Sequence, residues 1–161
     1  DYLMRLERTV APLPLQIEAA AEMDSQATQI DVLGKLRESL KAEGSGITLI
    51  ADEWCNTLDD VSRFAQAGAV DMVQVKMPDL GGITQSVKAV LKCHEHGLGA
   101  YLGGSCNETD LNARNAVHLA VATGAEQVLA RPGMGVDEGV CIMRNEEARL
   151  RAMLTRRGVA I

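Results

Sequence analysis

The chain alternates short apolar segments with longer segments of helical periodicity, and this strand–helix unit repeats five times. The apolar segments have the length of strands and cover residues 13–18, 47–52, 72–76, 100–103 and 127–130. The helical segments cover residues 26–42, 58–67, 83–96, 108–122 and 137–156. This alternation predicts an α/β fold with a parallel sheet, either doubly wound or part of a (β/α)₈ barrel.

Five units are too few to close an eight-stranded barrel, which typically takes about 250 residues, whereas this chain has 161. Either the chain forms an open five-stranded domain, or it is part of a barrel whose beginning is missing. The opening residues, DYLMRLERTV, look like the tail of a helix, and the first of them is not methionine. We therefore expect residues 1–161 to form a partial barrel domain of five consecutive βα units.

Composition excludes several classes of function. A formal net charge of −6 and dispersed basic residues argue against a nucleic-acid partner. No signal peptide is visible and the apolar runs are far shorter than the roughly 20 residues that cross a bilayer, so we expect a cytoplasmic protein without a membrane partner. The four cysteines show neither CxxC nor zinc-ligand spacing, so we expect reduced thiols.

Polar side chains stand at the carboxyl ends of the predicted strands, where parallel α/β folds carry their functional sites. The first strand ends in Glu18, the second in Asp52 and the third in Lys76, and Gln74 shares a face with Lys76 because strand side chains alternate. Glu18 and Asp52 could share one hard cation such as Mg²⁺, which accepts carboxylates and waters as ligands. A lysine nearby could act as a general base if burial and the cation lower its pKa.

A structural interpretation competes with this catalytic one. A strand-end carboxylate can cap the following helix, and a strand-end lysine can simply pair with it. Taken singly, each residue fits either interpretation. Taken together, two carboxylates and an amine suit proton abstraction next to a carboxylate, in which a metal ion neutralises the developing charge and the amine removes the proton.

Four segments resemble one family of the enolase superfamily, the methylaspartate ammonia-lyases. They are ADEWCNT (51–57), VQVKMPDLGGI (73–83), AYLGGSCNETDLNAR (100–114) and RPGMGVDEG (131–139). The resemblance implies an enolase-type barrel with a separate N-terminal capping domain, and a homodimer. It also implies a carbon–nitrogen lyase of glutamate fermentation that converts L-threo-3-methylaspartate reversibly to mesaconate and ammonia. Such an enzyme requires Mg²⁺ and is assisted by a monovalent cation such as K⁺.

The resemblance also assigns roles at matching positions. Lys76 matches the base that removes the proton from C3, and Glu18 and Asp52 match two of three metal ligands. Gln74 matches a substrate-binding amide. Ser105 and Cys106 match a pair that holds a substrate carboxylate, with Ser105 in place of the usual threonine.

The resemblance places the family's remaining metal ligand, a catalytic histidine and the capping domain before the first residue of this chain. We therefore expect the isolated 161-residue polypeptide to have little activity, to bind Mg²⁺ weakly and to self-associate through its edge strands.

Two alternatives stay open. One is another enolase-superfamily enzyme, such as a racemase or cycloisomerase, against which the GGSCNET string argues. The other is a non-enzymatic α/β binding domain. His118 lies within a helical repeat, and we interpret it as a packed or partly exposed histidine rather than a ligand.

Overall fold

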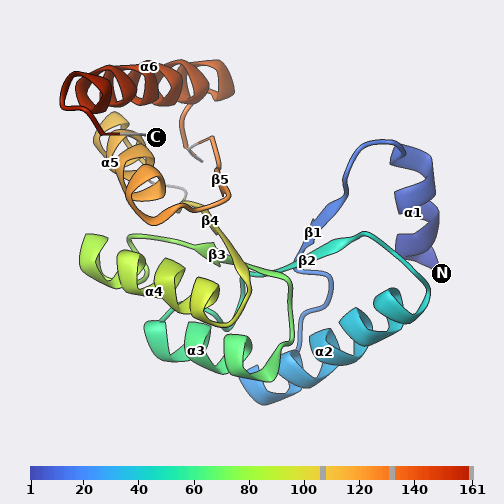
Figure 1. The fold of residues 1–161 in the computed structure, drawn as a ribbon. Coiled ribbons are helices and arrows are strands. Elements are labelled where there is room, and N and C mark those ends of the chain that lie inside the picture. The colour runs from blue at the N-terminus through green and yellow to red at the C-terminus, as the bar shows by residue number, and fades with distance from the viewer. Residues whose placement is uncertain (106–107, 131–132, 160–161) are drawn as a thin grey trace.

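A computed structural model describes residues 1–105, 108–130 and 133–159 (Figure 1). Its strands are short and alternate with longer helices, as predicted. In chain order the elements are α1 (Tyr2–Val10), β1 (Gln16–Glu18), α2 (Gln26–Ala42), β2 (Thr48–Ala51), α3 (Leu58–Ala67), β3 (Met72–Val75), α4 (Ile83–Glu95), β4 (Gly99–Leu102), α5 (Asp110–Thr123), β5 (Gln127–Val128) and α6 (Val136–Arg156).

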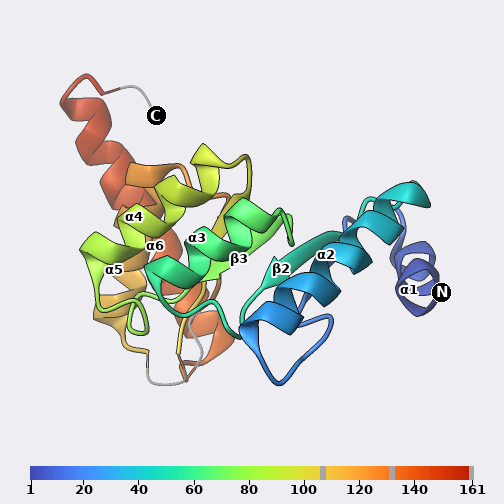
Figure 2. The same cartoon turned by 90° about the horizontal axis from the view of Figure 1, so that it is seen from below.

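The five strands form one parallel sheet in which each strand pairs with the next strand along the chain, in the order β1-β2-β3-β4-β5. A doubly wound sheet reverses its strand order at a switch point, whereas the wall of a barrel does not. The helices follow one another in an arc around the strands in Figure 1, and α3 and α4 lie side by side also in the view of Figure 2. The sheet is therefore the wall of an open barrel.

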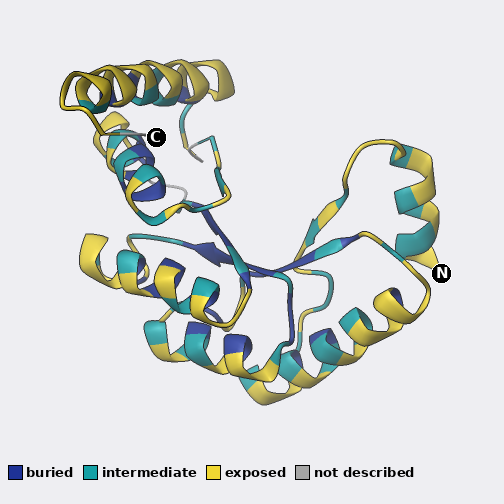
Figure 3. Ribbon diagram, in the orientation of Figure 1, coloured by how far each residue is buried: buried dark blue, intermediate teal, exposed yellow. Residues whose placement is uncertain are grey.

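The main core lies between this sheet and its helices. Residues at alternate strand positions, such as Val73 and Val75, pack with Phe64 and Val90 of the covering helices. Figure 3 shows the middle strands, β2 to β4, as the most buried part of the ribbon. The other face of the sheet carries a second, smaller cluster, formed by Ile50, Met72 and Tyr101.

Local signals explain why the helices begin and end where they do. The Thr57 side chain accepts a hydrogen bond from the backbone N–H of Asp60, and the Asp60 side chain accepts one from the backbone N–H of Thr57. The two bonds form a capping box at the start of α3. Helix α3 ends at Gly68 in the left-handed conformation, with φ of 59°, which glycine adopts without strain.

The structure differs from the predicted boundaries mainly at the ends of the strands: β1 begins at Gln16 rather than at residue 13, and β5 ends at Val128 rather than at residue 130. Asp52 and Lys76 lie one residue beyond β2 and β3 instead of ending them. Helix α5 begins at Asp110 rather than at residue 108, because the Glu108 side chain accepts a hydrogen bond from the backbone of Ser105. In the described part of the chain, no helix is both long enough and apolar enough to cross a membrane.

Candidate active site

The candidate site lies where strands β1 to β4 end. Glu18 is the last residue of β1, and the register pairs it with Ile50, which precedes Asp52 by two positions on the same face. Gln74 pairs with Tyr101 across β3 and β4, and Lys76 follows Gln74 by two positions. These side chains therefore share the face opposite the main core, as the alternation predicted.

Lys76 and Asp52 come together directly: the ammonium group forms an ion pair with Oδ1 of the carboxylate. Both side chains are largely buried, 17% and 14% exposed respectively. Desolvation by itself lowers the pKa of Lys76, but the Asp52 carboxylate and the charges of Glu53 and Asp79 outweigh it, so that the pKa is raised overall. With this partner the amine stays protonated.

Glu18 and Gln74 meet at a residue that the sequence analysis did not select. The hydroxyl of Tyr101 donates a hydrogen bond to Oε2 of Glu18, and the Gln74 amide lies against the same phenol. Gln74 is itself buried and packs under Gly103, where a Cβ atom would lie 2.2 Å from its Oε1. Only glycine fits at residue 103 while Gln74 keeps this position.

The loop after β4 carries the predicted substrate-binding pair. The backbone N–H of Ser105 donates a hydrogen bond of 2.9 Å to Oε1 of the buried Glu108, which holds the loop in a tight turn. Ser105 is thus brought to the same end of the sheet as Lys76. Cys106 lies outside the described residues.

The loops after β1 and β2 contain two strained positions that the sequence did not reveal. Ala19 and Trp54 have φ of 50° and 62°, values that residues with a side chain rarely adopt. The indole N–H of Trp54 donates to the carbonyl of Met23 at 2.9 Å, and the Gln26 amide donates to the carbonyl of Trp54 at 2.8 Å. These bonds tie together the two loops that follow Glu18 and Asp52.

The donor set fits Mg²⁺ as a partial site. Glu18 and Asp52 supply hard carboxylate oxygens from neighbouring strands, and the Lys76 ammonium beside Asp52 shows that this position accommodates positive charge. Among the described residues no three or more His, Cys, Asp and Glu side chains gather as a metal site. Waters, substrate or other protein groups would complete the coordination, as Mg²⁺ commonly requires.

Two other features near the sheet, a buried cysteine and a hollow between α5 and α6, are not part of the candidate site. Cys55 is buried close to Asp52 and Lys76, and burial raises the pKa of its thiol, so it is not an activated nucleophile. A hollow of about 690 Å³ lies at the amino end of β5, between α5 and α6, and its lining includes Val117, Met143 and Arg151. Among the described residues, none of the predicted site residues lines this hollow.

Comparison with known proteins places the chain in a family. The family "methylaspartate ammonia-lyase C-terminus" matches residues 1–156. Methylaspartate ammonia-lyase 1 of Carboxydothermus hydrogenoformans is 55% identical over 99% of this chain and 38% of its own length. The chain thus spans about two fifths of the length of such relatives.

Solved structures agree with this match. The Mg complex of β-methylaspartase from Clostridium tetanomorphum superposes with a TM-score of 0.94 at 43% identity, over 98% of this chain and 38% of that one. The methylaspartate ammonia lyase of Citrobacter amalonaticus, solved with (2S,3S)-3-methylaspartic acid, gives 0.92 at 46% identity, over 96% of this chain and 38% of that one. The chain belongs to the methylaspartate ammonia-lyase family, and its five parallel βα units form the half-barrel of that family's C-terminal region.

Proposed function

We propose that the full-length protein is a carbon–nitrogen lyase that eliminates ammonia from L-threo-3-methylaspartate to give mesaconate, in the degradation of glutamate. The observation that carries this proposal is the convergence of Lys76, Asp52 and Gln74 at the carboxyl end of a barrel wall. The relative solved with (2S,3S)-3-methylaspartic acid supports the choice of substrate.

Lys76 is the base in this proposal. Its amine removes the proton from C3 of the substrate, and the electron pair released there forms the double bond as ammonia leaves C2. The amine can accept this proton only after it has lost its own, and its ion pair with Asp52 opposes that loss. Lys76 therefore becomes a base only when another cation takes over the Asp52 carboxylate.

Glu18 and Asp52 would hold that cation, Mg²⁺, which the relative from Clostridium tetanomorphum contains. When bound, Mg²⁺ supplies positive charge that stabilises the extra negative charge on the substrate carboxylate during proton removal. Gln74, Ser105 and Cys106 would orient the substrate carboxylates. A monovalent cation such as K⁺ would assist.

The proposal extends to the environment of the enzyme. We expect a cytoplasmic homodimer that acts on a small amino acid, without nucleic-acid or membrane partners, and in which a capping domain covers the barrel. The polypeptide of residues 1–161 by itself would turn over little substrate, because the described residues supply two carboxylate ligands from an open wall.

A product assay on the purified full-length protein tests the proposed reaction. Incubation with L-threo-3-methylaspartate and Mg²⁺ should release mesaconate and ammonia in equal amounts, and EDTA should stop the release. A parallel assay for racemisation or lactone formation separates the other enolase-superfamily chemistries. Racemisation without ammonia release would contradict the proposal.

A further inference from the structure

Tyr101 occupies a central position on the inner face of the barrel wall. It lies on β4, pairs with Gln74 of β3 and is only 2% exposed. Its ring packs with Ile50 and Met72, which come from β2 and β3. The ring is thus fixed by apolar contacts from two strands, while its hydroxyl reaches toward polar groups.

Those polar groups are two residues that the proposed reaction uses. The hydroxyl donates to Oε2 of Glu18, 83 residues away in sequence, and the Gln74 amide lies against it. The hydrogen bond makes the phenol a donor that is directed at the Glu18 carboxylate.

Glu18 needs such a partner. It ends a strand of three residues at the edge of the sheet, and its side chain is exposed. Within the described residues, the hydrogen bond that its carboxylate accepts comes from Tyr101. An exposed glutamate without such a partner samples several rotamers, and ordering it when a metal ion binds costs conformational entropy. A hydrogen bond that fixes one rotamer beforehand removes this cost from metal binding.

We propose that Tyr101 is a positioning residue that fixes the Glu18 carboxylate for a divalent cation and couples it to the substrate-orienting amide of Gln74. The inference rests on the proposed function in that it takes Glu18 as a metal ligand. Hydrogen-bond partners of metal-ligating residues typically contribute about 10-fold to 100-fold to metal affinity.

Isothermal titration of metal-free, full-length protein with Mg²⁺ tests this inference. The Tyr101→Phe variant keeps the ring and removes only the hydroxyl, so we expect its dissociation constant for Mg²⁺ to rise by about 10-fold or more. Tyr2→Phe is the matched control, because Tyr2 is 68% exposed, and it should bind Mg²⁺ like the wild type. The circular dichroism spectrum reports whether each variant is folded.

The outcomes separate the inference from the function on which it rests. Failure of the wild type to bind Mg²⁺ would contradict the proposed metal site itself. Binding by the wild type with an unchanged dissociation constant in Tyr101→Phe would overturn the positioning role alone. If Tyr101→Phe does not fold, Tyr101→Met provides a second side chain without a hydroxyl that can fill the same apolar surroundings; it should also weaken Mg²⁺ binding by about 10-fold, and unchanged binding would overturn the inference.

Discussion

The ammonium group of Lys76 forms an ion pair with the Asp52 carboxylate. An ion pair with a purely structural role could have the same geometry. Its surroundings favour a task beyond structure. The pair lies at the carboxyl end of parallel strands, next to the buried amide of Gln74, and both partners are largely shielded from water. In the proposed reaction, this pair would hold the base in place until a metal ion and substrate bind.

The cysteines give a prediction at the same scale. Cys55 and Cys93 are buried, and burial raises the pKa of Cys55 and raises that of Cys93 to about 12, whereas Cys141 is exposed. Because the thiolate is the reactive form, iodoacetamide should label Cys141 at least about 100 times faster than the two buried thiols. Peptide mapping by mass spectrometry measures the rates. Rates that are equal in the native state would mean that the core opens readily.

Alternation predicted which side chains share the inner face, but not which of them touch. Glu18, Gln74 and Lys76 follow from period-two spacing on strands. Tyr101 lies at an alternating position too, yet an aromatic residue in a strand is most simply interpreted as core, and its ring does pack as core. Its contact with Glu18 depends on how strands β1 and β4 approach one another, which no local pattern encodes.

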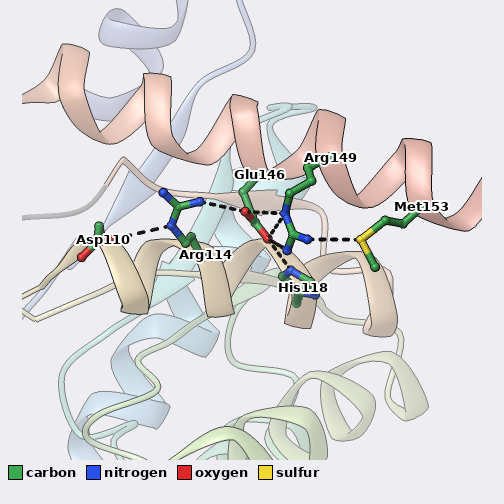
Figure 4. Close-up of polar contacts among 6 residues, drawn as sticks. All are labelled: Asp110, Arg114, His118, Glu146, Arg149 and Met153. Carbon is green, nitrogen blue, oxygen red and sulfur yellow. Dashed lines mark hydrogen bonds and ion pairs between the residues drawn. The ribbon is translucent and has the colours of Figure 1, made fainter.

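At the scale of elements, the buried carboxylate of Glu146 connects helices α5 and α6 (Figure 4). Glu146 of α6 accepts hydrogen bonds from Arg114 of α5 at 2.9 Å and from Arg149 of its own helix, and it contacts His118 of α5 at 2.7 Å. Arg114 also reaches toward Asp110 in the first turn of α5, at 3.7 Å. His118 is thus a partly exposed structural residue, as the sequence predicted.

This network predicts how stability depends on pH. Hydrogen bonds from Arg149 and His118 lower the pKa of Glu146 to about 2 from its ordinary 4.5. As the pH falls, Glu146 therefore takes up a proton at a lower pH in the folded protein than in the unfolded chain. The stabilisation is complete above about pH 4.5 and is lost between pH 4.5 and 2.

Substitution tests the network directly. Glu146→Gln should lower the midpoint of thermal unfolding at pH 7 by about 2 to 4 °C, a modest change because the surrounding cations are partly exposed and screened. The difference from the wild type should shrink as the pH approaches 2. Glu147→Gln is the matched control, since Glu147 forms an exposed pair with Arg151 on the same helix. An equal effect of both variants would contradict a special role for Glu146.

The lengths of the helices were largely predictable, and the ends of the strands were less so. Helices α2 and α3 have the predicted bounds, because capping side chains and terminal glycines mark them in the sequence. Strands β2 and β3 end one residue earlier than predicted, because Asp52 and Lys76 lie outside the strand pairing and form an ion pair with each other. The sequence shows the residue types there, but the pairing that displaces them depends on the assembled sheet.

For the whole molecule, the central feature is a barrel wall with two edges. In the described structure, β1 pairs only with β2 and β5 only with β4, so each edge strand presents backbone groups without a strand partner. The side chains of Gln16 and Gln127 exchange two hydrogen bonds, of 3.2 and 3.0 Å, between β1 and β5. This contact links the edges through side chains and leaves their backbones available.

The open edges predict the behaviour of a polypeptide limited to residues 1–161. In sedimentation velocity it should associate increasingly as its concentration rises, because exposed strand edges pair with one another. Its rate of mesaconate formation should be close to background, since its described residues supply only two carboxylates to the proposed metal site. A clean monomer at high concentration would contradict the first expectation, and measurable turnover would contradict the second.

Periodicity predicted the five parallel units and fits two architectures, whereas the opening residues and the family resemblance favoured the partial barrel, which is confirmed. Hydrophobic periodicity is the same in a doubly wound sheet and in a barrel, because both bury parallel strands under helices. Strand order distinguishes them, and it follows from contacts between strands rather than from any one segment. The capping domain stays a prediction from the family resemblance.

Steady-state turnover of a Lys76→Ala variant shows whether Lys76 is the base. In the full-length protein with saturating Mg²⁺ and L-threo-3-methylaspartate, loss of a general base should reduce mesaconate formation by a factor of about 10² to 10⁴. Lys35→Ala, which removes an exposed lysine from its ion pair with Asp31, should turn over like the wild type.

Thermal unfolding of the same samples shows whether Lys76 also supports the fold. With saturating Mg²⁺ present, the Lys76→Ala midpoint should stay within about 4 °C of the wild type, because the bound cation compensates the buried Asp52 charge that loss of the lysine would leave unpaired. Turnover that survives in the folded variant would contradict the assignment of Lys76 as the base. Collapse of the fold would instead identify the Lys76–Asp52 pair as structural.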